Sequence, residues 1–383
     1  MQYRQFGKND WQVSALGFGC MRLPILDDDS SIINEEMAQA MIYKAIDDGV
    51  NYLDTAYSYH RGQSEVFLGK ILKDGYREKV KLATKMPSWL VKTADDLDRL
   101  FEEQLTRLKT DHIDVYLLHA LNASHWQNYQ ALKVFDWAEK KMAEGLINNL
   151  GFSFHDTYEV FDKIINGYDN WDFCQIQYNY MDTNYQAGMQ GLHQAAEKGL
   201  AVVVMEPLRG GSLAKNPAPP VVAEAFAKSG KEWSPAEWAL QWVWNQPQVS
   251  LCLSGMSTME QVEENLVSAA QSGIDTLPAE DLQVIEDVRQ AYLSLTPIPC
   301  TKCEYCLPCP NDVAIPTIFA IYNEAIMYDN PRSARWAYNN EVKAENRADN
   351  CIECGLCEEA CPQQIEIIDW LKKADAFLTT KDN

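Results

Sequence analysis

Basic residues are scarce in this sequence: 33 Lys and Arg stand against 55 Asp and Glu, and the formal net charge is −22 over 383 residues. So large a negative charge argues against a nucleic-acid backbone or an anionic membrane as partner. No apolar run approaches the roughly 20 residues that a membrane span needs, and the N-terminal residues lack the apolar stretch of a signal peptide. The sequence therefore predicts a cytoplasmic protein that binds neither nucleic acid nor membrane.

A disulfide scaffold is unexpected in that compartment, where thiols are kept reduced, yet the chain has 11 cysteines. Cys20, Cys174 and Cys252 are scattered, whereas the other eight form two groups near the C-terminus. With 46% hydrophobic residues, the chain has enough apolar surface for a folded core. The change in cysteine usage predicts a large domain over residues 1–295 and a small one over residues 296–383.

From residue 10 to about residue 270, short apolar runs alternate with amphipathic stretches whose apolar residues are spaced by three and four. The expected strands lie at residues 14–18, 51–55, 80–85, 112–118, 147–153, 173–178, 200–205 and 249–253. The expected helices lie at residues 35–48, 64–73, 95–108, 129–143, 158–166, 186–198, 235–245 and 259–270. Eight strands, each followed by a helix, are the count of a (β/α)8 TIM barrel, here preceded by a hairpin up to Trp11. A doubly wound open sheet stays an alternative, because periodicity does not report closure.

The two cysteine groups have the spacing of iron–sulfur ligands. The second, Cys351–Cys361, has the C-x2-C-x2-C-x3-C-P pattern of bacterial-type ferredoxins, and the first, Cys300–Cys309, is one residue shorter before its fourth cysteine. Three cysteines two residues apart can wrap one loop around three corners of a [4Fe-4S] cube, and in two-cluster proteins the fourth ligand comes from the other motif. The expected metal-binding groups are Cys300, Cys303, Cys306 and Cys361 for one cluster, and Cys351, Cys354, Cys357 and Cys309 for the other.

Zinc is the alternative metal for these cysteines. Structural zinc sites take two cysteines from each of two Cys-x-x-Cys knuckles, which leaves the middle cysteine of each triple run without a role. Two [4Fe-4S] clusters are therefore favoured over zinc and over disulfides. The chain between the two groups has helical patterns at residues 315–328 and 333–344, so a mainly helical ferredoxin-like domain is expected.

Four polar residues of the predicted barrel stand at or just after strand ends. Asp54, Lys85 and His119 close the second, third and fourth strands, and Tyr59 lies on the loop after Asp54. Each alone is more often a solvated or core residue, but strand C-termini surround the mouth of a barrel, so together these side chains should converge. A Lys85 ammonium held by Asp54 favours the phenolate of Tyr59, so the pKa of Tyr59 should fall from about 10 towards the working pH. Such a tyrosine can give a proton to a carbonyl oxygen while a hydride arrives at carbon.

Several stretches of the chain match motifs of a known family. They are Leu16–Gly19, Asp54–Tyr59, Ile113–His119, Gly151–Ser153, Gln175–Tyr178, Glu206–Gly211, Glu263–Asn265 and, near the C-terminus, Cys303–Pro310. Residues 1–295 resemble the aldo-keto reductase superfamily, and the whole chain resembles its subgroup with a C-terminal ferredoxin-like domain. The resemblance implies a tetrad in which Tyr59 is the general acid, Lys85 and Asp54 tune it, and His119 orients the substrate.

The resemblance also implies a nicotinamide cofactor, NADPH or NADH, bound in an extended pose across the barrel mouth without a Rossmann loop. The implied cofactor contacts are Gly19, Cys20, Ser153, Gln175, Met205, Leu208, Gly210, Gln261, Glu264 and Asn265. Within that set, Ser153 and Gln175 are expected at the carboxamide. Leu208 and Gly210 are expected near the pyrophosphate, and Glu264 and Asn265 at the adenine.

The sequence departs from the family pattern at several of these positions. Phe154 follows Ser153 where many relatives have asparagine, and Met205 stands where many have an aromatic ring. NADPH-preferring relatives often carry Lys and Arg at the positions matching Gly255 and Gln261, and neither is basic here. The choice between NADP and NAD therefore stays open, with Arg209 as a candidate compensating charge.

The leading hypothesis is a cytoplasmic oxidoreductase that reduces a small-molecule carbonyl or oxidises an alcohol, with Tyr59 as general acid/base. Its two [4Fe-4S] clusters would serve electron transfer, with a ferredoxin or a flavoprotein as redox partner. The alternative is an iron–sulfur electron carrier whose barrel is a binding or docking module. Trp89, Trp126 and Tyr178 are candidate walls of the substrate pocket, and core packing explains these aromatics about as well.

Overall fold

The computed structural model describes residues 1–380 and divides the chain into two compact units. The barrel unit comprises residues 1–216 and 232–282, and the C-terminal unit comprises residues 217–231 together with the chain from residue 283 onward. The boundaries of these two units differ from the single domain boundary expected near residue 296, and that boundary stays a prediction. Among residues 1–380, no helix is long and apolar enough to cross a membrane.

Eight parallel strands form a closed barrel in the order β10-β11-β12-β3-β6-β7-β8-β9. Their bounds are β3 (Leu16–Gly19), β6 (Tyr52–Asp54), β7 (Lys81–Met86), β8 (Ile113–Leu121), β9 (Ile147–Phe154), β10 (Phe173–Gln177), β11 (Ala201–Met205) and β12 (Leu251–Ser254). The (β/α)8 prediction is confirmed, and the open-sheet alternative is wrong. Since all eight strands run the same way, their C-terminal ends gather at one mouth, which is where barrel chemistry is built.

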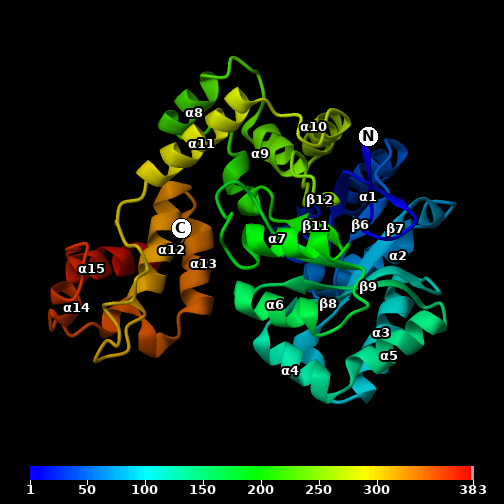
Figure 1. Cartoon of the computed structure of the whole chain (residues 1–383), viewed down its shortest axis with the longest axis horizontal. Coiled ribbons are helices and arrows are strands. Elements are labelled where there is room, and N and C mark those ends of the chain that lie inside the picture. The colour runs from blue at the N-terminus through cyan, green and yellow to red at the C-terminus, as the bar shows by residue number, and fades with distance from the viewer. Residues whose placement is uncertain (381–383) are drawn as a thin grey trace. The chain divides into compact units, whose positions relative to one another are not determined.

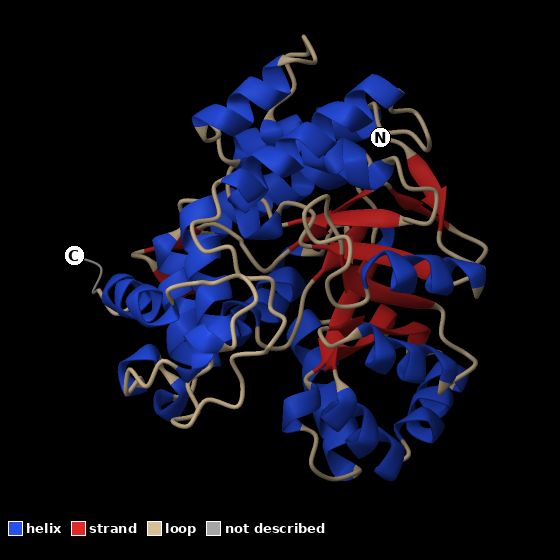
Figure 2. Cartoon of the chain, turned by 60° about the vertical axis from the view of Figure 1, so that its left-hand side comes forward, coloured by secondary structure: helices blue, strands red, loops and turns tan. Residues whose placement is uncertain are grey.

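Helices surround the strands of the barrel unit (Figure 1), and Figure 2 shows these helices in blue outside the red strands. They are α1 (Glu35–Asp47), α2 (Gln63–Ile71), α3 (Asp95–Leu108), α4 (Ala123–Ala131), α5 (Val134–Ala143), α6 (Tyr158–Asn166), α7 (Gly188–Glu197), α9 (Pro235–Trp244) and α10 (Met259–Ala270). The single helix expected at residues 129–143 is wrong. The structure has α4 and α5 instead, because Lys133 adopts a left-handed backbone conformation with φ of 54° that interrupts the helix.

Helix α3 illustrates how the sequence pattern produces these helices. Asp95 and Asp96 lie in its first turn, where negative charge is favoured by the partial positive charge of the helix N-terminus. Leu97, Leu100 and Phe101 are buried on the side that faces the strands. The spacing of three and four thus places the apolar stripe inward, as expected for a helix on a barrel.

Two hairpins precede the first barrel helix. The hairpin of β1 (Tyr3–Gln5) and β2 (Gln12–Ser14) confirms the one expected before Trp11, and a second, of β4 (Ile25–Leu26) and β5 (Asp29–Ile33), was not predicted. Phe6, fully buried, stacks on Trp11 with ring centroids 4.3 Å apart and packs within the same apolar cluster as Tyr52 and Phe173. Those two residues begin β6 and β10, so the first hairpin covers the end of the barrel opposite the mouth.

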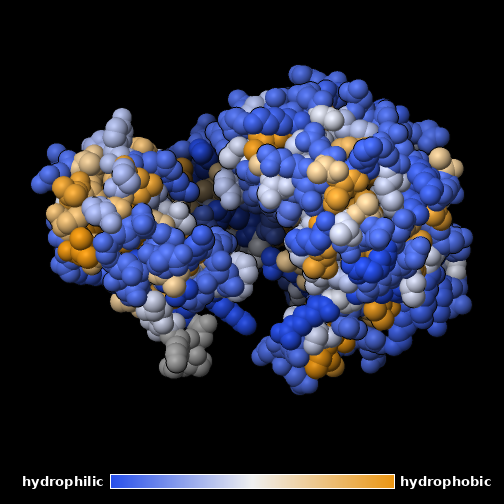
Figure 3. Space-filling view, turned by 90° about the horizontal axis from the view of Figure 1, so that it is seen from below, coloured by the Kyte–Doolittle hydropathy of each residue, from blue (hydrophilic) through white to orange (hydrophobic). Residues whose placement is uncertain are grey.

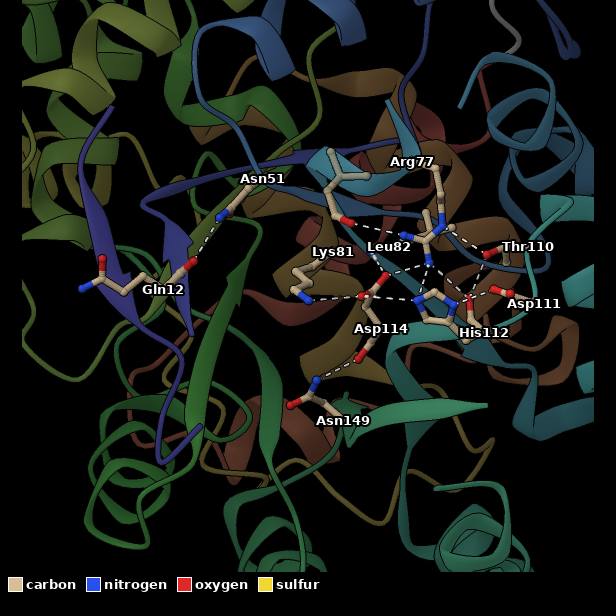
Figure 4. Close-up of polar contacts among 11 residues, drawn as sticks. Gln12, Asn51, Arg77, Lys81, Leu82, Thr110, Asp111, His112, Asp114 and Asn149 are labelled. Carbon is tan, nitrogen blue, oxygen red and sulfur yellow. Dashed lines mark hydrogen bonds and ion pairs between the residues drawn. The ribbon is translucent and has the colours of Figure 1, made fainter. Parts of the chain in front are cut away.

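A buried carboxylate organises that same end of the barrel (Figure 4). Asp114, near the start of β8, forms ion pairs with Arg77 at 2.8 Å and with Lys81 at 3.4 Å. Its second oxygen also accepts a hydrogen bond from the backbone N–H of Leu82 at 3.1 Å, which ties β8 to β7. Its backbone oxygen accepts from the side chain of Asn149 at 2.8 Å. Because these contacts lie at the N-terminal ends of the strands, they serve stability rather than chemistry.

We expect Asp114→Ala to lower the free energy of unfolding by about 3–5 kcal/mol, the usual result of removing one partner from a buried ion pair. Arg77, whose side chain is 15% exposed, would lose its closest carboxylate. Urea unfolding of the barrel, followed by tryptophan fluorescence, measures the change. Asp111→Ala is the matched control, since the Asp111 side chain is 95% exposed and should leave the midpoint nearly unchanged. Equal midpoints for the two variants would contradict this role of Asp114.

The C-terminal unit is helical, as expected. It holds α8 (Pro220–Ala227), most of α11 (Ala279–Ser294), α12 (Ile315–Met327), α13 (Pro331–Glu341), α14 (Leu356–Glu359) and α15 (Ile367–Leu378). Its own apolar core includes Ile318 and Phe319 of α12, Tyr338 of α13 and Leu371 of α15. The two cysteine loops, which are non-helical except for α14, pack against this core.

Candidate active site

Asp54, Lys85 and Tyr59 meet at the mouth of the barrel. Asp54 is the last residue of β6, Lys85 lies near the end of the neighbouring β7, and Tyr59 begins a short 3-10 turn, Tyr59–Gly62. The ammonium of Lys85 donates to Asp54 Oδ1 at 2.7 Å and to the hydroxyl oxygen of Tyr59 at 3.3 Å. It also donates to the backbone oxygen of Thr55 at 2.7 Å. The sequence expectation that these side chains converge agrees with this geometry.

Lys85 and Asp54 form a fully enclosed ion pair, with the Lys85 side chain 0% and the Asp54 side chain 3% exposed. Burial lowers the pKa of Lys85, but the Asp54 carboxylate and the Tyr59 oxygen together raise it above its ordinary value. Burial raises the pKa of Asp54, and the Lys85 ammonium opposes that rise. The pair therefore keeps a positive charge beside the Tyr59 hydroxyl, where it stabilises any negative charge that develops there.

The expected fall in the pKa of Tyr59 is not found. Burial raises the pKa of Tyr59 above its ordinary value, and the Lys85 ammonium offsets only part of that rise. A phenolate in this enclosed mouth would lose its hydration, and one cation at 3.3 Å does not replace it. Tyr59 therefore rests as a neutral phenol, ready to donate rather than to accept a proton.

His119 faces Tyr59 from β8, with the two ring centroids 6.2 Å apart in an edge-to-face arrangement. The pairing of β8 with β9 is irregular between Leu118 and Leu121, so His119 lies at a break in the ladder rather than at the strand end expected from sequence. Burial, with the Lys85 ammonium as a smaller cause, holds the pKa of His119 well below its ordinary value. Its buried Nδ1 has no hydrogen-bond partner among residues 1–380. A neutral imidazole here can hydrogen-bond a ligand oxygen without competing for the proton.

Only one of the three candidate wall aromatics reaches this site. The ring of Trp89, which is 38% exposed, lies 5.1 Å from that of His119. Trp126 is 7% exposed and packs on Phe135, and Tyr178 is 2% exposed and packs on Trp242. Trp126 and Tyr178 are therefore core residues, and of the three only Trp89 lies beside His119.

A buried polar network behind the tetrad was missed by the sequence analysis. The Gln104 side chain donates to the backbone oxygen of Lys85 at 3.0 Å and to Glu65 at 2.7 Å. Thr84 donates to Glu65 at 2.6 Å, and Arg107 pairs with Glu65 at 3.2 Å. These contacts join α2, α3 and β7, so they hold the strand segment that carries Lys85. A glutamine on the apolar face of α3 was the only signal in the sequence.

His60, next to Tyr59, is a second residue that the sequence did not single out. Its Nε2 accepts a hydrogen bond from the backbone N–H of Leu23 at 3.2 Å, and its Nδ1 donates to the backbone oxygen of Ser30 at 2.8 Å. Burial lowers the pKa of His60, which favours this neutral ring. His60 thereby joins the turn that carries Tyr59 to Leu23 and to Ser30 of the second hairpin.

Ser153 and Gln175 lie side by side on adjacent strands. They are register partners of β9 and β10, and both are buried. Ser153 Oγ accepts a hydrogen bond from the backbone N–H of Ala120 at 2.8 Å. The Gln175 amide nitrogen lies 3.5 Å from the sulfur of Met205, and the Gln175 side-chain oxygen is buried without a partner in the part of the chain that the structure describes. An unpaired buried acceptor suits a ligand that brings an N–H donor, as a carboxamide does.

Gly19, the last residue of β3, and Cys20, which follows it, lie at the mouth beside β6. Gly19 is the register partner of Asp54, and the backbone N–H of Cys20 donates to the backbone oxygen of Asp54 at 2.8 Å. A side chain on Gly19 would come within 3.3 Å of the backbone oxygen of Ser254. Burial raises the pKa of the Cys20 thiol, so it stays neutral.

A cavity of about 650 Å³ lies in the barrel unit along the end of β12 and the start of α10. The expected cofactor positions Leu208, Gly210, Gln261, Glu264 and Asn265 all line it. Of the residues that the structure describes, the tetrad, Gly19, Cys20, Ser153, Gln175 and Met205 are not among those lining it. Asn265, the one buried member, donates to Ser254 Oγ at 3.0 Å. The cavity thus suits the pyrophosphate and adenosine parts of an extended dinucleotide, with the mouth residues left for its reactive end.

Arg22, which the sequence analysis missed, brings a positive charge to this cavity. Its Nη2 lies 3.7 Å from Glu206 Oε1. Its aliphatic chain covers Gly255, since a Cβ at Gly255 would lie 3.2 Å from Arg22 Cδ. Arg209, the candidate compensating charge, instead donates to Asp182 at 3.0 Å and is not one of the residues that line the cavity.

The cysteines of the C-terminal unit line two cavities. One is walled by Cys309, Cys351, Cys354 and Cys357, the other by Cys300, Cys303 and Cys361, and Cys306 touches both. All eight cysteines are free thiols, and Cys303 and Cys354 are exposed. Among residues 1–380, no three His, Cys, Asp or Glu side chains are gathered closely enough for a single metal ion. One cavity brings Cys361 to the first cysteine loop and the other brings Cys309 to the second, while the assignment of these thiols as cluster ligands stays a prediction.

Comparisons with known proteins match two separate stretches of the chain. A model described as the aldo/keto reductase family matches residues 15–289, and one described as a 4Fe-4S dicluster domain matches residues 299–366. Similar curated proteins include the uncharacterized oxidoreductase YqkF of Bacillus subtilis, 26% identical over 70% of this chain and 91% of its own. The L-galactose dehydrogenase of Arabidopsis thaliana is 26% identical over 77% of this chain and 97% of its own.

A solved structure shares the barrel. The holo form of aldo-keto reductase AKR11C1 from Bacillus halodurans matches with a TM-score of 0.61 and 27% identity. The match covers 75% of this chain and 96% of that one. The barrel unit is therefore similar to complete relatives, and the cysteine-rich part is additional to them.

Proposed function

Since this chain belongs to the aldo/keto reductase family and is an oxidoreductase, we propose that its barrel interconverts a small-molecule carbonyl and the corresponding alcohol with a nicotinamide cofactor. The observation that carries the proposal is the enclosed Lys85 ammonium, 2.7 Å from Asp54 and 3.3 Å from the hydroxyl of Tyr59. Burying an ion pair is energetically costly, and a buried ion pair whose ammonium lies beside a phenol hydroxyl is typical of acid–base catalysis.

Each member of the tetrad has a separate task in this proposal. Bound nicotinamide supplies or accepts the hydride. Tyr59 donates its hydroxyl proton to the carbonyl oxygen, and Lys85 stabilises the negative charge left on the phenol oxygen. Asp54 keeps Lys85 charged and in place. His119, as a neutral imidazole, hydrogen-bonds the substrate carbonyl oxygen and so orients the carbonyl group.

The cofactor is proposed to lie across the mouth, with its carboxamide on Ser153 and Gln175 and its phosphates and adenosine in the cavity beside α10. The unpaired Gln175 oxygen supports the first contact. The cavity and the start of α10, where backbone N–H groups favour anions, support the second. Arg22 is the basic residue in the lining, and Glu206, Glu260 and Glu264 are acidic. Either NADH or NADPH fits this proposal, and titration decides between them.

The C-terminal unit is proposed to hold two [4Fe-4S] clusters on the two cysteine groups. Such clusters exchange single electrons. The proposal rests on the match to a 4Fe-4S dicluster domain and on two cavities that each gather thiols from both loops. A redox partner protein, a ferredoxin or a flavoprotein, would then exchange electrons with this unit.

The pH dependence follows from the state of Tyr59. Reduction needs the phenol and oxidation needs the phenolate, and burial raises the pKa of Tyr59 above its ordinary value. We expect kcat/KM for reduction to stay level up to about pH 9, whereas kcat/KM for oxidation rises about tenfold per pH unit over the same range. His119 adds no inflection near pH 6.5, because its pKa lies well below that value. Rate profiles in both directions check this, and a reduction rate that falls across the neutral range would contradict it.

Nucleotide titration of the anaerobically purified chain tests the function itself. We expect NADH or NADPH to bind with a Kd of about 1–100 μM and to support reduction of at least one aldehyde, ketone or sugar in a panel. Iron and acid-labile sulfide are measured on the same sample. If these are present but neither nucleotide binds, the alternative of an electron carrier with a docking barrel replaces the enzyme.

A further inference from the structure

Three large apolar side chains are exposed around one cysteine cavity of the C-terminal unit. Tyr305 is 68%, Ile352 58% and Leu356 55% exposed. All three line the cavity walled by Cys351, Cys354 and their partners. We call Tyr305, Ile352 and Leu356 the cluster-edge patch. Apolar residues gather on part of the surface of this unit in the space-filling view (Figure 3).

Single exposed apolar residues are ordinary, but a group of them at one rim marks an interaction site. These three side chains come from both cysteine loops and meet at the same opening. Cys354, between Ile352 and Leu356, is itself exposed. A cluster held by these thiols would therefore have an edge at the surface, and electron exchange between proteins needs the two centres to approach closely.

Acidic residues lie next to the patch residues in the sequence. Glu304 and Glu353 directly precede Tyr305 and Cys354, Glu359 follows shortly after Leu356, and all three carboxylates are exposed. Glu353 pairs with Lys372 at 2.8 Å, whereas Glu304 and Glu359 form no ion pair with any residue that the structure describes. With a net charge of −22 on the whole chain, a second copy would be repelled, whereas a basic protein would be attracted.

We propose that the cluster-edge patch is the docking surface for a one-electron carrier protein whose cofactor edge is ringed by Lys and Arg. This inference rests on the proposed clusters. On docking, one electron passes from a reduced cluster to the oxidised carrier, and no atom or proton is transferred. The apolar side chains exclude water at the contact, and the carboxylates orient the encounter.

A basic c-type cytochrome serves as the probe for this surface. Its affinity for the immobilised cluster-loaded chain is measured by biolayer interferometry. Its reduction by the dithionite-reduced chain, freed of excess reductant, is followed by stopped flow. The double variant Ile352→Ser with Leu356→Ser should raise the Kd at least tenfold and lower the bimolecular rate constant by a similar factor. Tyr305→Ser, on the other cysteine loop, should act in the same direction, so the test does not depend on one loop assembling normally.

Trp336→Ser is the matched control, since Trp336 is 63% exposed on α13 and is not one of the residues lining either cysteine cavity. Patch variants with full iron content that bind and react within twofold of this control overturn the docking surface but leave the clusters standing. The surface is also overturned if the patch variants change only self-association in sedimentation. Absence of iron and sulfide from the wild-type chain overturns the proposed clusters, and the docking surface with them.

Discussion

Tyr59→Phe is expected to lower kcat/KM for carbonyl reduction by about 10²–10⁴-fold, the usual contribution of a positioned general acid. Phenylalanine keeps the ring that lies 4.7 Å from the Lys85 ammonium and 6.2 Å from the His119 ring, and it removes only the hydroxyl. The affinity for the nicotinamide should therefore stay within about twofold of wild type. Steady-state kinetics and nucleotide titration on the same preparation measure both quantities.

Tyr57→Phe is a matched control on the same loop. The hydroxyl of Tyr57 donates to Glu103 at 3.1 Å and its ring lies against Arg107, so it is a tyrosine of similar setting that faces away from the tetrad. We expect it to keep nearly full activity. If Tyr59→Phe reduces carbonyls as well as Tyr57→Phe does, Tyr59 is not the proton donor, and the tetrad assignment fails.

Alanine at a cluster cysteine is expected to remove about half of the bound iron, from about eight atoms per chain to about four, because each [4Fe-4S] cluster needs four thiolates. Cys361→Ala should remove the cluster that shares Cys300, and Cys309→Ala the cluster that shares Cys351. Iron and sulfide analysis with low-temperature electron paramagnetic resonance of the reduced protein measures the loss.

Double variants distinguish crossed from sequential pairing. If the thiols that line each cavity bind one cluster, the double variant Cys361→Ala with Cys300→Ala loses no more iron than either single variant. The double variant Cys361→Ala with Cys309→Ala then loses all of the iron. Pairing within each motif predicts the opposite for the first double variant. Cys174→Ala, a fully buried barrel cysteine outside both cavities, should retain full iron.

Much of the barrel could be predicted from periodicity. All eight strands and most helices lie within a few residues of their expected positions, because apolar spacing reports burial on each element separately. The break between α4 and α5 could not be predicted, because it depends on the backbone conformation of Lys133, a residue type common inside helices. The hairpin of β4 and β5 escaped notice because its strands are short and largely exposed.

The candidate site was predictable in position but not in its electrostatics. Asp54, Tyr59, Lys85 and His119 were found because strand ends of a parallel barrel share one mouth. The sign of the Tyr59 shift was wrong, because burial depends on every element that covers the mouth and not on the nearest charge. Gln104 and His60 act on the site only through contacts made across the fold.

By itself, the sequence determined the class of chemistry and the barrel repeat, and it predicted the cluster ligands. These features are local: thiols at fixed short spacing can bind one cube, and a residue at a strand end is at the mouth in any barrel. Only the tertiary structure decided that the sheet closes and that burial raises the pKa of Tyr59, so that Tyr59 rests as a neutral phenol. Those outcomes depend on neighbours distant in the chain.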